Sequence, residues 1–227
     1  MLMIVAPATT MDFEQDAPDV AAMKPHFLDE AALLMTQLKQ YDKAGLQAVL
    51  GISESLAEEN HERFQAWTAA AHDTAVALPA LFAFRGATYQ GVDADTLTDA
   101  QLAYAQDHLR IMTGLYGVLR PFDRILPYRL ELKTKLPTGT EADDSLYNFW
   151  GAKPTEFLND ALAATGSDVV VNLASNEYVR AIKKRQLNGR FLDIGFKEKK
   201  GDKFRTISFY AKEARGRMAR YIIENEV

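Results

Sequence analysis

Two short, largely apolar runs constrain the fold of this chain more than any other feature. The chain opens with MLMIVAP, which is closed by Pro7, and DVVVNLAS occupies residues 168–175. Both runs are shorter than an ordinary helix and are bounded by turn-forming or polar residues. Each run therefore predicts a buried strand.

Elsewhere apolar residues recur at helical spacing. The predicted helices span residues 26–38, 53–71, 98–114 and 145–164, with Ser53 and Thr98 as caps and Gly166 as a stop. The segments FLDIGF, KEKKGDK and FRTISFY, residues 191–210, predict a β-hairpin, and a basic helix of about residues 211–224 follows it. Helices and strands interleave without a regular βαβ period, which predicts an α+β fold with a mixed sheet and surrounding helices.

The size and composition set wider limits. The 227 residues are enough for one sizeable core, so we expect one domain covering residues 1–227. The absence of cysteine excludes disulfides, thiolate metal sites and thiol nucleophiles. The four histidines are scattered, so no preformed metal site and no cofactor are predicted. No apolar run reaches the roughly 20 residues of a spanning helix, and no positively charged leader opens the chain, so we expect a cytoplasmic protein without a membrane partner.

The net charge of −5 averages two regions of opposite sign. Residues 1–100 contain 5 Lys and Arg against 15 Asp and Glu, whereas residues 180–220 contain 14 against 4. A basic segment of this size attracts polyanions even in an acidic protein. The alternative is a solvated face, or a segment that pairs with the acidic half inside the fold.

The segment GLYGVLRPFDRILPYRLEL, residues 114–132, is rich in glycine and proline, with two glycines three residues apart followed by two prolines. A hairpin between two short helices explains this pattern, and its glycines would let backbone amides approach a phosphate. Arg110, Arg120 and Arg124 would add charge beside it. A simple helix cap with a tight connection is the alternative.

Polar residues at strand ends are candidates for a site. Thr9, Thr10 and Asp12 follow the first predicted strand, and Asn172, Ser175 and Glu177 lie at the end of the second. Isolated carboxylates beside turns are more often caps or ion-pair partners than catalysts. No phosphate-binding loop, dinucleotide fingerprint or nucleophile elbow is present.

Several of these segments together resemble the YaaA peroxide-stress-resistance family. The motifs are LFAFRGATYQGV (81–92), residues 114–132, LYNFWG (146–151), NLASNEY (172–178) and ISFYAKEARGRMARYII (207–223). The resemblance implies a cytosolic protein that is induced by hydrogen peroxide and lowers unincorporated intracellular iron. It also implies DNA binding through a helix-hairpin-helix-like element and a positive cleft.

Two departures from the family pattern matter. The family usually has Ser-Pro-Ala-Lys-Thr after its first strand, whereas this chain has Ala6-Pro7-Ala8-Thr9-Thr10, so any role of that lysine is absent. Relatives commonly carry a further C-terminal tail rich in Gly, Phe and Tyr, whereas this sequence ends at Val227. We therefore expect either a short member of the family or a missing tail.

Three functional hypotheses follow. The first is a DNA-binding stress protein that grips double-stranded or distorted DNA in a basic cleft. Its predicted contacts are Arg85, Arg110, Gly114, Gly117, Arg120, Arg124, Arg129, Lys183, Lys184, Lys212 and Arg215. The residues predicted to line an adjoining pocket are Tyr128, Trp150, Asn172, Ser175 and Glu177.

The second hypothesis is an enzyme that acts on a nucleic-acid base or a small phosphorylated substrate in the same cleft. Its candidate catalytic residues are Asp12, Tyr128, Glu177 and Lys212. The third is direct iron binding by Asp, Glu and Tyr oxygens, although no clustered spacing indicates it. No protein partner is predicted.

Overall fold

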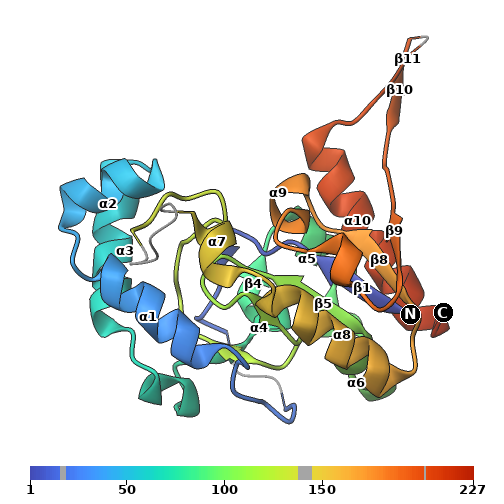
Figure 1. Ribbon diagram of the computed structural model, residues 1–227, viewed down its shortest axis with the longest axis horizontal. Helices are drawn as coiled ribbons and strands as arrows, with labels where there is room; N and C mark the ends of the chain where they lie inside the picture. Colours follow the sequence, from blue (N-terminus) through green and yellow to red (C-terminus); the bar gives the residue numbers. More distant parts are fainter. Residues whose placement is uncertain (16–18, 138–144, 202) are drawn as a thin grey trace.

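The computed structural model describes residues 1–15, 19–137, 145–201 and 203–227. At its centre lies a five-stranded sheet in the order β6-β5-β1-β8-β9 (Figure 1). Its strands are β1 (Leu2–Val5), β5 (Leu109–Met112), β6 (Val118–Leu119), β8 (Val169–Leu173) and β9 (Arg190–Asp193). All neighbours pair in parallel except β6, which runs antiparallel to β5 at one edge. The fold is α+β, as the sequence predicts.

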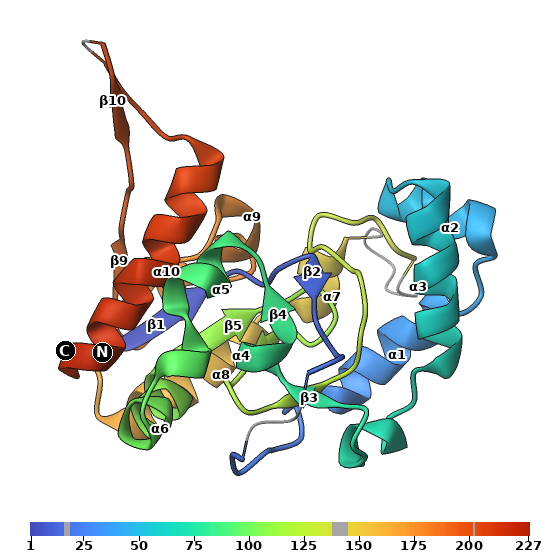
Figure 2. The same cartoon turned by 180° about the vertical axis from the view of Figure 1, so that it is seen from behind.

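Both apolar runs form adjacent central strands. β1 pairs with β8 from Leu2 opposite Val170 to Val5 opposite Leu173, and every residue of β1 is buried. One face of the sheet is covered by α8 (Lys153–Thr165), and the other by α5 (Ala87–Val92) and α10 (Ser208–Asn225) (Figures 1 and 2). Coverage on both faces explains why these strands have no polar alternation.

The other elements surround this sheet. The remaining helices are α1 (Leu28–Leu38), α2 (Lys43–Leu50), α3 (Glu54–Ala66), α4 (Ala80–Ala83), α6 (Asp99–His108), α7 (Leu146–Trp150) and α9 (Asn176–Val179). Short strands pair as β2 (Thr10–Met11) with β4 (Phe84–Arg85), and β3 (Leu78–Pro79) with β7 (Arg124–Ile125). Short 3-10 turns span Ala70–Asp73, Ala94–Thr96 and Lys184–Gln186. In both views α1, α2 and α3 form a helical group at the end of the molecule away from α10 (Figures 1 and 2).

The predicted caps are confirmed. The Ser53 hydroxyl accepts from the amide of Leu56, and Thr98 forms a full capping box with Gln101. Gly166 ends α8 in the left-handed conformation, at φ 63°. The single helix predicted over 145–164 is two helices, because the chain turns at Gly151, where φ is 54°.

The segment 98–132 differs from the predicted helix-hairpin-helix. The helix ends at His108, ten residues after its cap, and the apolar residues 109–112 continue as the sheet strand β5. The glycine pair then turns the chain back into β6, so the hairpin joins two strands. Among the described residues, no helix lies between His108 and Leu146. The apolar residues 109–112 would also suit the face of a helix, but here they pair with the neighbouring strand β1.

The strands of the C-terminal hairpin are shorter than predicted. Its strands are β10 (Glu198–Lys200) and β11 (Lys203–Arg205), and Asp202 of the predicted turn lies outside the described residues. Residues 190–193 join the main sheet as β9, and residues 208–210 begin α10. The hairpin projects from the body beyond the start of α10 (Figures 1 and 2).

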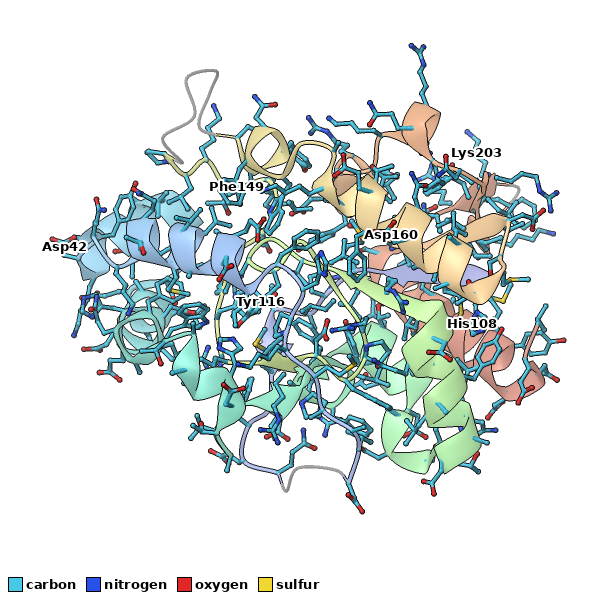
Figure 3. The ribbon with its side chains drawn as sticks, turned by 60° about the horizontal axis from the view of Figure 1, so that its bottom comes forward. Asp42, His108, Tyr116, Phe149, Asp160 and Lys203 are labelled. Atoms are coloured by element: carbon cyan, nitrogen blue, oxygen red, sulfur yellow. The ribbon has the colours of Figure 1, made fainter. Side chains whose placement is uncertain are left out.

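A buried polar network occupies the centre of the molecule around Tyr116 (Figure 3). The Tyr116 hydroxyl accepts from Trp67 Nε1–H at 3.1 Å and from the Leu126 amide at 3.3 Å. It is left to donate to His72 Nε2, 2.9 Å away, while Nδ1–H of His72 donates to the Thr68 carbonyl at 3.1 Å. These four bonds require the neutral imidazole.

This network predicts a pH-dependent stability. Burial lowers the pKa of His72 below its usual value of 6.5. The unfolded chain therefore binds a proton more readily, and stability falls as the pH drops below about 6.5, by at most about 1.4 kcal/mol per pH unit. We expect His72→Asn to flatten this slope in urea unfolding measured at several pH values, whereas His61→Gln should retain it. An unchanged slope in His72→Asn would assign the pH dependence to other groups.

Candidate functional site

A cavity of about 310 Å³ opens at the carboxyl ends of β1 and β8, and we call it the carboxyl-edge cavity. Parallel sheets commonly bind ligands at this edge, where the loops that leave adjacent strands diverge. Its lining comes from four parts of the chain: residues 6–10, 85–89, 173–178 and the start of α10, with Glu131 between them. Elements far apart in the sequence therefore converge on one site.

Two backbone features place these elements. Gly86 has φ 126°, a conformation that L side chains rarely adopt, and it turns the chain from β4 into α5. Gly91 of α5 and Gly216 of α10 face each other, and a Cβ added to Gly216 would lie 1.9 Å from the Thr88 carbonyl oxygen. The Thr88 hydroxyl also donates to the Lys212 carbonyl at 3.1 Å. Close helix contact thus brings the basic face of α10 to the cavity.

The cationic wall consists of Arg85, Lys212 and Arg215. Arg85 is held by Asp12, by Asp95 at 3.3 Å and by a hydrogen bond to Gln15. Lys212 is exposed, and no carboxylate lies within 4 Å of its ammonium group among the described residues.

Arg215 is the most unusual cation of this wall. It is half-buried, and its Nε has no hydrogen-bond partner in the described part of the chain. Burial lowers the pKa of its guanidinium below the usual range of an arginine. A buried guanidinium donor without a partner costs free energy, which an anionic ligand would recover.

The cavity is also lined by two carboxylates, Glu131 and Glu177, which we call the carboxylate wall. Glu131 forms an ion pair with Lys133 Nζ at 2.8 Å, and Glu177 accepts from the Lys133 amide at 3.2 Å. Burial, together with the charge of Glu131, raises the pKa of Glu177 above its usual value of 4.5. The lining of the site therefore contains both cations and carboxylates.

Hydroxyl and aromatic groups complete the cavity. Ser175 and Thr10 line it, and so do Tyr178 and Phe209, whose side chain is 61% exposed. Phe209, Lys212 and Arg215 are spaced by three residues on α10, so they share one helix face. A smaller cavity of about 30 Å³ adjoins the first and contains the predicted residues Tyr128 and Arg129.

A second basic surface lies on the other side of α9. A concavity of about 540 Å³ is lined by Arg180, Lys183, Lys184 and Arg185, together with apolar residues. Asn176 belongs to the same lining, next in sequence to Glu177 of the carboxyl-edge cavity. The short helix α9 therefore separates the two hollows.

Figure 3 shows the side chain of Lys203 at the periphery, far from the central Tyr116. Lys203 belongs to the projecting hairpin, which also carries the exposed side chains of Lys199 and Arg205. Phe204 pairs across the strands with Lys199 and is 66% exposed. No ion pair involves these cations within the described residues. The hairpin therefore presents a basic and aromatic arm to solvent.

The described residues contain no group of three or more His, Asp or Glu side chains placed to hold a metal ion. Within them, no helix is both long enough and apolar enough to cross a membrane.

The sequence of the whole chain decides its family. The profile of the family described as peroxide stress protein YaaA matches residues 1–227. The chain belongs to this family. It is 45% identical over 227 residues to a UPF0246 protein of Saccharophagus degradans, covering 100% of this chain and 88% of the relative. It is 46% identical over 231 residues to the UPF0246 protein Shewana3_3143 of Shewanella sp. strain ANA-3, covering 100% of this chain and 87% of the relative.

The YaaA-like motifs of this chain fall into two groups. Residues 81–92, 172–178 and 207–223 meet at the carboxyl-edge cavity. Most of residues 114–132 and 146–151 are buried in the core beside it, with only Glu131 reaching the cavity. The first group is therefore placed for ligand contact, and the second supports the fold.

Three of the predicted DNA contacts are buried inside the protein. Arg110 is 6% exposed, donates to the carbonyls of Gln106 and Leu109, and has a pKa lowered to about 10 by burial. Gly114 and Gly117 are buried. A Cβ added to Gly114 would lie 2.2 Å from the Leu130 carbonyl oxygen, and one added to Gly117 would lie 2.7 Å from the Trp150 ring. These glycines thus allow close packing, and Arg110 presents no surface to a phosphate.

Arg120 and Arg124 are also engaged within the protein. Arg120 donates to the buried carboxylate of Asp123 through Nε at 2.9 Å and Nη2 at 2.7 Å. Arg124 donates to the Thr74 carbonyl at 3.3 Å. By contrast, Arg85, Lys212 and Arg215 line the cavity, while Lys183 and Lys184 are exposed beside it.

Among the predicted pocket residues, Ser175 and Glu177 line the carboxyl-edge cavity and Tyr128 lines its small neighbour. Trp150 is fully buried, with its indole N–H bonded to the Gly114 carbonyl at 3.0 Å. Asn172 donates to Asp193 on β9 at 2.7 Å, and it accepts from the Ala174 amide. These two residues support the strand ends without lining either cavity.

The predicted catalytic candidates gather in one region. Glu177 and Lys212 line the carboxyl-edge cavity, Tyr128 lines its neighbour, and Asp12 pairs with the cavity residue Arg85. The sequence interpretation missed Phe209, whose spacing from Lys212 and Arg215 is the signal that would have found it.

Proposed function

We propose that this protein acts in the peroxide stress response by binding DNA in a basic groove that runs over the carboxyl-edge cavity. The family description supports the stress role. The observation that carries the DNA proposal is the convergence of cations at one edge of the molecule. The cavity wall, the concavity beyond α9 and the projecting hairpin each contribute basic side chains.

The pairing of these cations favours an external anion. Arg217 and Arg220 of α10, and Lys184 and Arg190, form ion pairs with neighbouring carboxylates. A larger set has no ion pair within the described residues, namely Arg180, Lys183, Arg185, Lys197, Lys199, Lys203, Arg205, Lys212 and Arg215. Lys212 and Arg215 line the cavity, and Arg180, Lys183 and Arg185 line the neighbouring concavity. The unpaired cations leave the basic segment only partly neutralised, which supports phosphate binding.

Direct iron binding draws no support from the described side chains, which form no metal-holding group. An enzymatic role has more in its favour, because a carboxylate with a raised pKa and a lysine face the same cavity. DNA binding and a reaction in this cavity are compatible.

The salt dependence of DNA affinity tests the proposal. Each phosphate contact contributes about 0.9 to the slope of log affinity against log salt concentration. We expect the double substitution Lys212→Gln and Arg215→Gln to reduce this slope by about 2 in fluorescence anisotropy with a labelled duplex. Affinity that is flat between about 50 and 200 mM salt, or a slope that the double variant leaves unchanged, would contradict the proposal.

A matched control is available on the same helix. Arg217 is a cation of α10 outside the cavity lining, and it is paired with Glu213 at 2.7 Å. Arg217→Gln removes one charge from the helix but none from the cavity. We expect it to change the slope by less than the loss of a full phosphate contact.

A further inference from the structure

We propose that the carboxyl-edge cavity binds a single nucleotide, with its phosphate beside Lys212 and Arg215 and its base beside Glu131 and Glu177. This inference rests on the proposed function and names the ligand of the same site. A site that only gripped DNA phosphates would gain nothing from two carboxylates, because like charges repel. The mixed charge of the cavity therefore suits a ligand with an anionic end and a hydrogen-bond-donating end.

The cationic wall suits the phosphate. Lys212 is exposed without a carboxylate partner, and Nε of Arg215 lacks an acceptor among the described residues. A phosphate presents several acceptor oxygens and bonds strongly to both kinds of cation. Arg85, already held by Asp12 and Asp95, contributes charge at the rim of this wall.

The carboxylate wall suits the donor edge of a base. An ionised carboxylate has about four acceptor sites, and backbone hydrogen bonds from Lys133, at 3.2 Å, and from Leu132 occupy two of those on Glu177. Burial beside Glu131 has cost this group part of its hydration, as its raised pKa reflects. Base N–H groups would supply the missing donors. Guanine presents two adjacent donors on one edge, N1–H and its exocyclic amino group, whereas thymine presents only N3–H, so the cavity favours guanine over thymine.

Size and aromatic lining agree with one nucleotide. About 310 Å³ lies at the lower end of the range for small-molecule sites, about 300–1,000 Å³. Phe209 stands at the edge of the cavity with 61% of its surface exposed, and Tyr178 lines the interior. Exposed aromatic rings in nucleic-acid-binding proteins stack on bases.

The nucleotide has two possible sources, a free nucleoside monophosphate or a nucleotide turned out of a bound strand. Two binding measurements on the full chain separate them. Isothermal titration uses dGMP, dTMP and inorganic phosphate. Fluorescence anisotropy uses a short thymine oligonucleotide and the same oligonucleotide with one central guanine. Duplex binding is measured in parallel for each variant.

We expect a guanine preference of about tenfold or more over thymine, which Glu177→Gln abolishes. The glutamine keeps the size of the side chain and an acceptor for the Lys133 amide, but replaces one acceptor oxygen with a donor. Phe209 is 61% exposed, and Phe209→Ala should weaken the binding of both nucleotides about tenfold. A preference in the titration assigns a free nucleotide, and a preference in the oligonucleotide alone assigns a strand nucleotide.

Three results would overturn this inference: equal binding of guanine and thymine in both measurements, inorganic phosphate binding as tightly as dGMP with no guanine preference in the oligonucleotide, or a guanine preference that survives Glu177→Gln. If salt-dependent duplex binding persists alongside any of them, only the nucleotide site fails. If duplex binding is absent as well, the proposed function fails with it.

Discussion

Replacing Arg120 with alanine is expected to destabilise the protein by about 3–5 kcal/mol. The Asp123 side chain has no solvent exposure, and its pKa is raised by burial even though Arg120 lies against it. Arg120 supplies its side-chain donors and also its backbone amide, at 2.8 Å. Without the guanidinium, a buried carboxylate loses its main counter-charge.

Urea unfolding measures this loss, and Asp123→Asn in the same background should recover part of it. The raised pKa of Asp123 also predicts how the loss of stability in Arg120→Ala depends on pH. Because the folded protein holds the Asp123 proton more tightly than the unfolded chain, the deficit of Arg120→Ala should shrink as the pH falls. Arg217→Ala is the control, since its exposed pair with Glu213 is worth about 1 kcal/mol or less. A loss of that size at Arg120 would refute the buried role.

This result decides how DNA-binding experiments are interpreted. Arg120 is an obvious candidate for a phosphate contact, and its substitution would lower DNA affinity by unfolding the protein. Lys212 and Arg215 are better tests, because neither forms an ion pair in the described structure.

The second large effect is expected at Gly216. A Cβ there would lie 1.9 Å from the Thr88 carbonyl oxygen and 2.9 Å from the Cα of Gly91, and both are backbone atoms that cannot rotate away. Overpacking of this kind costs about 3 kcal/mol. The higher helix propensity of alanine offsets at most about 1 kcal/mol. We therefore expect Gly216→Ala to destabilise the protein by about 2 kcal/mol or more.

Thermal unfolding checks this value, with an expected fall in melting temperature of roughly 4–8 °C. Gly195→Ala is the control, because nothing lies within 4 Å of a Cβ at that position. The variant should also bind DNA more weakly, since α10 carries Lys212 and Arg215. If Gly216→Ala is as stable as the natural protein, the close contact between α5 and α10 contributes little to stability, and this prediction is wrong.

The central strands could be predicted because their environment leaves a direct mark on the sequence. β1 and β8 are covered on both faces, so β1 is a continuous apolar run and β8 is apolar except for Asn172. The caps at Ser53 and Thr98 were equally predictable, because a cap depends on side chains within a few residues.

The structure of the segment around Gly114 and Gly117 could not be predicted from the sequence in this way. A glycine that exposes an amide to phosphate and a glycine that makes room for a neighbouring chain look identical in sequence. Here the neighbours are Leu130 and Trp150, the latter separated from Gly117 by thirty-three positions in the chain. Likewise, nothing local to Leu109 shows that β1 would draw it out of a helix.

Some features of the candidate site could be predicted from the sequence and others could not. Ser175 and Glu177 were predictable from their place at a strand end, and Lys212 and Arg215 from charge and resemblance. The convergence of α5 with α10 depends on Gly91 and Gly216, which interact across the fold. The mixed charge of the cavity therefore emerged only from the three-dimensional structure.

Amide chemical-shift mapping with a short DNA duplex tests the central claim most directly. The account predicts that the largest shifts occur in residues 6–10, 85–89, 176–185 and 203–215, which surround the carboxyl-edge cavity and the arm. Residues 109–125, which are mostly buried or internally paired, should change little. The largest shifts at residues 109–125, with the cavity residues unmoved, would contradict it.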